Sequence, residues 1–185
     1  PGRGIPAAQD DGTITLLASS AGNRTIDLAD DRRLTLDLNG FQWLCPGQTL
    51  RISHGDLTLT GQGKLYEQQS QGAPVTLWGS DDPDTELYTS LTVGKDVTLE
   101  GRHGLWIGPG EEGQHAYGIS AVLHGTVKST ASPSDSGSAL YLSQTAWAEE
   151  GNVPQILLDG PPSSHREAPG CTWVAMPRPP SPILP

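Results

Sequence analysis

Apolar and polar residues alternate in many short stretches between Thr13 and Gly160. Alternation over three to five residues is typical of a β-strand with one buried face and one solvent face. No stretch in this range shows an apolar stripe of helical period, and each glycine would cost about 1 kcal/mol in a helix interior. The pattern therefore predicts an all-β chain. The predicted strands are Thr13–Leu16, Thr25–Leu28, Leu34–Leu38, Thr49–Ile52, Leu57–Leu59, Val75–Leu77, Leu91–Val93, Val97–Leu99, Leu105–Ile107, Gly125–Val127, Ala139–Leu142 and Ile156–Leu158.

The segment from Gly55 to Tyr66 returns forty residues later, from Lys95 to Trp106. Each copy contains a short alternating strand, a glycine-marked corner and a second short strand with an aromatic residue. A β-sandwich would also contain many short strands, but the hairpin dipeptides Asn-Gly and Asp-Gly occur at only three places in the sequence. The repeat therefore favours a parallel solenoid, and its offset suggests two coils of about twenty residues each.

In such a solenoid the leucines and valines at alternate strand positions fill one continuous interior. Leu57 is expected to lie about 4.8 Å from its counterpart in each neighbouring coil. The intervening threonines face solvent, where β-branched residues keep strand propensity. Aspartate at Leu36 should cost several kcal/mol because it would bury an unpaired charge.

The segments Leu34–Gly40 and Gly55–Gly63 resemble the signature "LTLDLNG … LTLTGxG" of right-handed parallel β-helix proteins of the pectin-lyase-like kind. The chain also resembles repetitive secreted or surface-displayed proteins of Gram-positive gut bacteria and of phage appendages. The resemblance covers roughly residues 10–159 and implies a right-handed single-stranded parallel β-helix of about seven coils. It also implies a location that is extracellular, on a cell surface or on a virion. It is specific for architecture and carries no activity with it.

The composition divides the chain into three parts, which are a flexible lead-in over 1–12, the β-helix over 13–160 and a proline-rich irregular tail over 161–185. Eight prolines fall in the tail, and the alternation stops there. One interpretation is a proline-rich linker. A second hypothesis is that the codons after about Gly160 are translated out of frame, because a single-base shift permits a strand-like continuation. The chain would then be a truncated, non-functional fragment of a longer β-helix protein.

Charge and hydropathy exclude some classes of partner. With a net charge of −10 and eleven basic residues, the chain lacks the electrostatic footprint of a nucleic-acid or anionic-membrane binder. No apolar run approaches the roughly 20 residues that span a bilayer, so we expect no membrane insertion. Cys45 and Cys171 are too few to staple a fold, and their disulfide status stays open. The chain begins at Pro1, which suits a mature product or a fragment.

The densest acidic run is a candidate metal site, formed by Asp81, Asp82, Asp84 and Glu86. Calcium is bound by clustered carboxylate oxygens, but the spacing fits no calcium-loop pattern and a solvated loop is the alternative. We expect no other cofactor. The resemblance also points to Asp27 and Asp37, since pectate-lyase-like enzymes place calcium-binding carboxylates on one parallel sheet. Their separation of half a coil argues against a shared site.

The segment from Arg102 to His124 contains three histidines and two glutamates. A histidine beside a carboxylate can perform acid–base catalysis. The glycines of this segment instead indicate a long turn in which polar residues are ordinary. No nucleophile, base and orienting residue are jointly specified, so we predict no catalytic residue. The residues weighed are Arg102, His103, Glu111, Glu112, His115, Tyr117 and His124.

Aromatic residues suggest a carbohydrate-binding groove, for which Trp43, Trp78, Trp106 and Trp147 are candidates. Trp78 and Trp106 alternate with apolar neighbours and are expected to point outward. The predicted carbohydrate-binding residues are Trp78, Trp106, Tyr66, Arg102 and His103.

The sequence thus favours a non-catalytic structural or adhesive protein whose partner is a polysaccharide or host surface glycan. The rival from another class is a polysaccharide lyase or glycoside hydrolase on the same scaffold. Further coils of a longer parent chain, or a homo-oligomer like those of phage appendages, are the other partners that the resemblance suggests.

Overall fold

The computed structural model describes residues 12–22, 24–26, 32–46, 50–68, 72–86, 88–109, 115–132, 135–143 and 154–159. These residues form β-strands and turns and contain no helix, which confirms the predicted all-β class. None of the described segments could cross a membrane as a helix. The predicted lead-in over 1–12, apart from residue 12 itself, and the predicted tail over 161–185 lie outside the described residues.

The strands form three parallel sheets, which we call A, B and C. Sheet A is ordered β1(Thr13–Thr15), β4(Arg33–Asp37), β7(Gly55–Thr60), β10(Thr89–Val93), β13(Ile119–Leu123), β16(Gln155–Leu158). Sheet B is ordered β14(Thr126–Ser129), β11(Val97–Gly101), β8(Gly63–Tyr66), β5(Gln42–Leu44), β2(Ser20–Ala21). Sheet C is ordered β15(Ser138–Leu142), β12(His103–Pro109), β9(Val75–Gly79), β6(Leu50–Ile52), β3(Arg24–Ile26).

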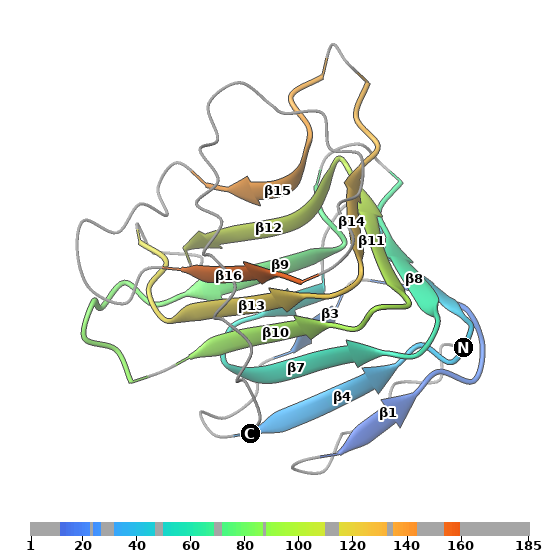
Figure 1. The fold of residues 1–185 in the computed structure, drawn as a ribbon, viewed down its shortest axis with the longest axis horizontal. Coiled ribbons are helices and arrows are strands. Elements are labelled where there is room, and N and C mark those ends of the chain that lie inside the picture. The colour runs from blue at the N-terminus through green and yellow to red at the C-terminus, as the bar shows by residue number, and fades with distance from the viewer. Residues whose placement is uncertain are drawn as a thin grey trace, which may run out of the picture.

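Consecutive strands visit sheets A, B and C in turn, so each strand pairs in parallel with the strand three places along the chain. We call three consecutive strands a coil. The described residues contain five such coils, followed by β16 alone, which is fewer than the about seven coils expected. Figure 1 shows the strands of sheet A stacked at the front, with β8, β11 and β14 at the right. This arrangement is consistent with a parallel β-solenoid.

The interior is a set of apolar columns that run through the stacked coils. In sheet A, one column joins Leu34, Leu57, Leu91 and Ala121, and each of these side chains is at most 5% exposed. Each fully buried leucine contributes about 1.5–3 kcal/mol relative to an exposed one. The threonines between them face outward, as the alternation predicted; Thr13, Thr35, Thr58 and Thr92 share one row.

The forty-residue repeat does not correspond to two coils, so that interpretation was wrong. Leu57 pairs with Leu91, 34 residues later, and Leu91 pairs with Ala121, so two coils here span 64 residues and not forty. The first copy supplies strands of sheets A and B, whereas the second supplies strands of sheets B and C. The two segments look alike because each contains an alternating strand, a corner marked by glycine and a second strand, although the two corners lie between different sheets.

The stretch from Arg102 to His124 is not one long turn, because it contains β12 and β13. One of its glycines, Gly104, allows close packing. A Cβ at Gly104 would lie 2.6 Å from Cγ1 of Val127 and 2.7 Å from the carbonyl oxygen of Ala139. Glycine was therefore a misleading turn signal here, since strands at a tight corner also need it.

The corner from sheet A to sheet B is short, with two to four residues in every coil. In the second coil it contains Asn39 and Gly40, whose φ angles are 49° and 83°. The backbone N–H of Asn39 donates to Oδ1 of Asp37 at 2.9 Å, and its Nδ2 donates to the carbonyl of Leu16 at 3.0 Å. Gly61 of the next coil, with φ 72°, lies against this turn.

Gly61→Ala is expected to destabilise the protein more than Gly40→Ala, which is the matched control. Both substitutions place a Cβ at positive φ, at a cost of about 1–2 kcal/mol. At Gly61 the Cβ would also meet Oδ1 of Asp37 and lie 2.9 Å from the Asn39 nitrogen, whereas nothing lies within 4 Å at Gly40. Urea unfolding of both variants would measure the difference, and equal losses of unfolding free energy would contradict this packing.

Candidate functional site

The outward side of sheet C carries a row of large side chains. Register places Arg51, Thr76, Trp106 and Tyr141 side by side on four successive strands. Their apolar sequence neighbours point into the core; Leu105 and Ile107, for example, are fully buried. Trp78 lies two residues beyond Thr76 on the same side of β9. We call Trp78, Trp106 and Tyr141 the aromatic strip, and it supplies one aromatic residue from each of three consecutive coils.

The rings at one end of the strip pack against each other and against His103. The Trp106 and Tyr141 centroids are 4.8 Å apart at 70°, which is the edge-to-face arrangement that aromatic pairs prefer. The His103 ring lies 4.3 Å from Tyr141 and 5.5 Å from Trp106. These contacts hold the three rings in fixed orientations.

Trp78 is held by a cation–π contact. The Arg51 Cζ lies 3.6 Å from the Trp78 ring centroid, within the range where such contacts stabilise. Opposite Trp78 in the register is Gly108, where a Cβ would come 3.1 Å from Nε1 of Trp106. Glycine at this position leaves room for the Trp106 indole, which lies against it.

Among the predicted carbohydrate-binding residues, the structure brings Trp78, Trp106 and His103 to sheet C, places Arg102 at the corner just before His103, and places Tyr66 on another sheet. Tyr66 lies on sheet B, where the Lys64 Nζ is 4.5 Å from its ring centroid. Arg102 occupies the corner between β11 and β12, and its Nη2 donates to Ser136 Oγ at 2.8 Å.

Trp43 was expected as a candidate for a surface groove, and this expectation was wrong. It is 2% exposed, belongs to the core, and its Nε1 donates to the Gly22 carbonyl at 2.9 Å. Trp147 lies outside the described residues. His103 is also largely buried, at 5% exposed, so its ring supports the strip from beneath and offers little surface of its own.

His103 is a buried titratable group with a defined hydrogen bond. Its Nδ1 lies 3.1 Å from Ser138 Oγ, on the strand that also carries Tyr141. Burial lowers the pKa of His103 below its ordinary value, and the nearby Arg102 charge lowers it further. The imidazole is therefore neutral at pH 7.

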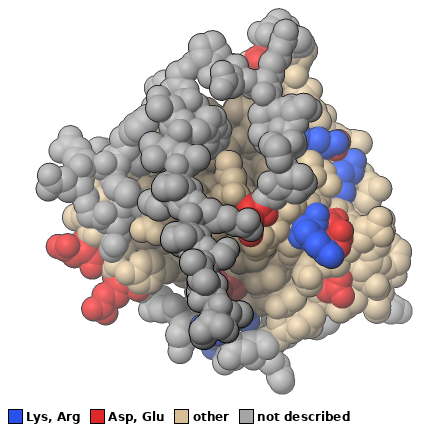
Figure 2. Space-filling model, viewed as in Figure 1, with Lys and Arg blue, Asp and Glu red and all other residues tan. Residues whose placement is uncertain are grey.

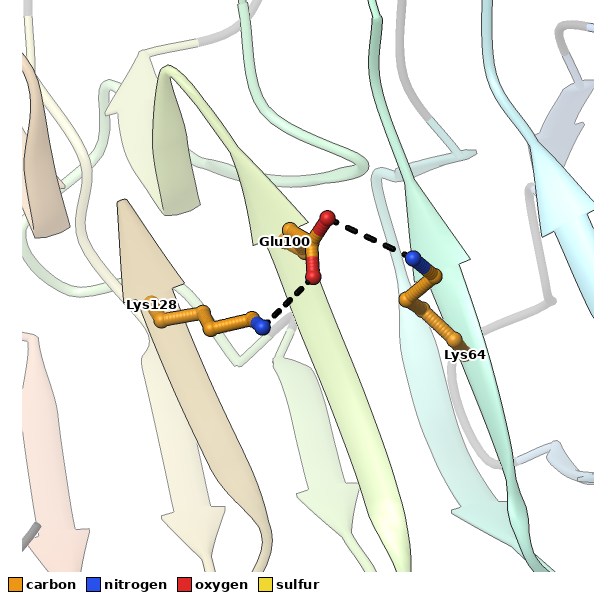
Figure 3. A network of polar contacts seen from close by, with 3 residues as sticks. All are labelled: Lys64, Glu100 and Lys128. Carbon is orange, nitrogen blue, oxygen red and sulfur yellow. Dashed lines mark hydrogen bonds and ion pairs between the residues drawn. The ribbon is translucent and has the colours of Figure 1, made fainter. Parts of the chain in front are cut away.

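Sheet B carries a network of charges on its outward side (Figure 3). Glu100 accepts from Lys128 Nζ at 2.7 Å and from Lys64 Nζ at 3.3 Å, which links three consecutive strands of the sheet. The hydrogen bond from Lys128 is the main cause that holds the pKa of Glu100 below its ordinary value, and partial burial opposes it. In Figure 2, basic and acidic side chains lie next to each other on the side where these strands run.

The predicted metal ligands lie in the connection between β9 and β10. Nδ1 of His115 lies 3.4 Å from Oδ1 of Asp81, which also accepts from the His115 backbone N–H at 2.6 Å. Oδ1 of Asp82 accepts from the Asp84 backbone N–H at 2.9 Å, as in a capped turn. The described residues contain no group of three or more acidic, histidine or cysteine side chains suited to a metal ion. Asp37 caps a turn, and Asp27 and Glu111 to Gln114 lie outside the described residues.

The histidines weighed for catalysis occupy different parts of the fold. His103 begins β12, His115 lies before β13 and stacks on Tyr117 at 5.5 Å, and His124 follows β13. Nδ1 of His124 lies 3.3 Å from Oδ2 of Asp159. Each histidine therefore has its own local partners.

Cys45 is buried and forms no disulfide within the described residues, and Cys171 lies beyond them. Burial raises the pKa of the Cys45 thiol to about 11. The thiol is therefore protonated near neutral pH and is a poor nucleophile.

Three groups of the site were not singled out in the sequence, namely Arg51, Tyr141 and the charges around Glu100. Arg51 and Tyr141 lie at outward positions of strands that the alternation predicted. The alternation of inward and outward positions could therefore have drawn attention to them. The contacts of Lys64 and Lys128 with Glu100 depend on the register between strands, for which the sequence contains no direct signal.

The chain matches no protein-family model, no curated protein and no solved structure among those compared. Its fold class therefore follows from the sheet topology, and the resemblance to pectin-lyase-like proteins stays a prediction.

Glu100→Gln is expected to destabilise the protein by about 1 kcal/mol, since it leaves two ammonium groups facing a neutral side chain. High salt should reduce this loss. Asp56→Asn is the control, because Asp56 pairs with Arg33 at 3.3 Å where both side chains are more exposed. Urea unfolding at low and high sodium chloride would compare them, and a larger loss for Asp56→Asn would contradict the importance of the Glu100 network.

Protonation of His103 should destabilise the fold on the acid side of neutrality. Because its pKa is lower in the folded chain than in the unfolded chain, the unfolded state binds more protons between the two values. The unfolding free energy should therefore fall as pH drops below about 6.5, until the folded pKa is passed. His103→Gln should remove this component of the pH profile, whereas His124→Gln should keep it; identical profiles for the two variants would contradict the assignment.

Proposed function

We propose that this chain is a right-handed, single-stranded parallel β-helix with a structural and adhesive function, and that its aromatic strip binds carbohydrate. The regular A, B, C order of parallel strands supports the β-helix, and crossovers between parallel strands are right-handed in about 98% of cases. An adhesive role fits a protein that works outside the cell, on a surface or on a virion.

The observation that carries the proposal is the aromatic strip of Trp78, Trp106 and Tyr141. Sugar rings present apolar C–H faces that stack on aromatic rings, and tryptophan and tyrosine add a polar N–H or O–H group for hydrogen bonding. The rings are held in place by Arg51 and His103, so little side-chain entropy would be lost on binding.

The placement of the strip favours an extended ligand. Its three residues come from consecutive coils, which repeat at about 4.8 Å along the axis. A glycan chain lying along the axis would meet one aromatic side chain per coil. A polysaccharide or host surface glycan is therefore the proposed partner.

The chemistry around the strip supports binding without catalysis. The five strands of sheet C contain no aspartate or glutamate. Glycoside hydrolysis ordinarily uses a pair of carboxyl groups about 5–10 Å apart. A lyase or hydrolase on this face would need acidic residues from elsewhere in the chain.

The test is binding to a panel of neutral and acidic polysaccharides by affinity electrophoresis and calorimetry. Trp106→Leu and Tyr141→Leu should each weaken binding at least about tenfold, equivalent to about 1.4 kcal/mol. Tyr66→Leu on sheet B is the matched control and should bind as the wild type does.

Circular dichroism and urea unfolding would show that each variant keeps its fold. Failure of the wild-type chain to bind any member of the panel, or equal weakening by Tyr66→Leu, would overturn the carbohydrate assignment. Release of new reducing ends from a polysaccharide would overturn the non-catalytic one.

A further inference from the structure

The two outermost strands of sheet A differ from the strands between them. Within the described residues, β1 pairs only with β4, and β16 pairs only with β13. Each therefore has one edge whose backbone N–H and C=O groups are not taken up by a strand described here. Such edges are templates for pairing with another chain.

At the β16 end, the interior columns reach solvent. Leu158 continues the column of Leu59, Val93 and Leu123, which are at most 4% exposed, but Leu158 itself is 52% exposed. Sheet C shows the same change, since Leu142 is 39% exposed while its partner Ile107 is fully buried. The apolar interior is thus left partly open at this end.

At the β1 end, the same column ends in Ile14, which pairs with Leu36 and is only partly buried. Leu17, just after β1, is 85% exposed. Both ends of sheet A therefore present apolar side chains beside an open strand edge.

These edges also lack the charges that usually protect them. Residues 12–22 contain no Asp, Glu, Lys or Arg, and neither do β15 and β16, although 17% of the chain is charged. Lysine, proline and bulges normally prevent edge-to-edge association. In a chain with net charge −10, these uncharged strands reduce the local repulsion between copies. Asp159, which directly follows β16, carries a charge, and its Oδ2 lies 3.3 Å from Nδ1 of His124.

We propose that these two edges bind each other in different copies of the chain, so that β1 of one copy pairs in parallel with β16 of the next. All strands of sheet A run in the same direction. A second copy displaced along the solenoid axis therefore places its β1 beside the free edge of β16. The two strands are then parallel, as β13 and β16 are on the other side. Ile14 of the second copy then lies next to Leu158 and extends the interior column. The contact is head-to-tail and does not close, so it produces linear oligomers.

Proline at the free edge tests this pairing directly, because it removes a backbone donor. The Gly12 carbonyl and the Leu16 N–H bond to β4, so alternation directs the Thr15 N–H to the free edge. The Asp159 N–H bonds to Leu123, so the Leu158 N–H points to the free edge of β16. Thr15→Pro and Leu158→Pro are the blocking variants, and Thr15→Val and Leu158→Ile are controls that keep the donor.

Sedimentation velocity over a range of concentrations would measure the outcome. The wild type and both controls should form concentration-dependent oligomers, whereas each proline variant alone should stay at the 19.5 kDa monomer mass. Each proline variant retains one functional edge, and the two edges are complementary. An equimolar mixture should therefore form a complex of twice the monomer mass and nothing larger.

Three results would overturn the proposal. The first is a wild-type chain that stays monomeric at every concentration. The second is a dimer formed by either proline variant alone, which would indicate that like edges pair. The third is an equimolar mixture of the two variants that stays monomeric. Urea unfolding of the full-length variants would show that the proline substitutions leave the folded state intact. The aromatic strip lies on sheet C and the two edges lie on sheet A. Polysaccharide binding by the proline variants can therefore be measured separately from their assembly.

Discussion

The parallel hydrogen-bond ladder between strands three places apart is the constraint on which the rest of this structure depends. It sets which residues share a column, so it decides that Leu57 packs on Leu91 and that Trp106 lies beside Tyr141. A shift of one residue in any strand would exchange its buried and outward side chains. The glycines at the corners from sheet A to sheet B protect this register, because they allow the turn between the two sheets to stay short.

The three outward faces use the same ladder for different chemistry. Sheet A presents a row of threonines, sheet B joins neighbouring strands through Glu100 and two lysines, and sheet C gathers aromatic residues without any carboxylate. Each interaction is modest by itself, but all of them cross from one coil to the next. The outward side chains therefore add to the cohesion that the leucine columns provide, and on sheet C they also create the surface to which we assign carbohydrate binding.

Much of the fold could be predicted from local pattern, since the alternation located most strands and the outward position of Trp78 and Trp106. What the pattern could not supply was register. The repeat suggested the wrong coil length, because a corner between sheets A and B and a corner between sheets B and C can carry the same residue types. For the same reason, Tyr66 was grouped with two tryptophans that lie on another sheet, and the neighbours of Glu100 went unrecognised. Trp43 shows a different limit: its indole N–H finds a backbone carbonyl inside the core, so a large aromatic residue with a polar group need not lie at the surface.

Connection length varies from coil to coil at two of the three corners. The connection from sheet A to sheet B never exceeds four residues, whereas sheet C is followed by two residues after β6 and by nine after β9. Added residues at these corners leave the stacked columns unchanged, because each strand still meets the same partner three places away. The molecule can therefore acquire a new loop beside its outward faces without rebuilding its core, and the segment between β9 and β10 is a natural point at which to graft a recognition loop in an engineered version of this chain.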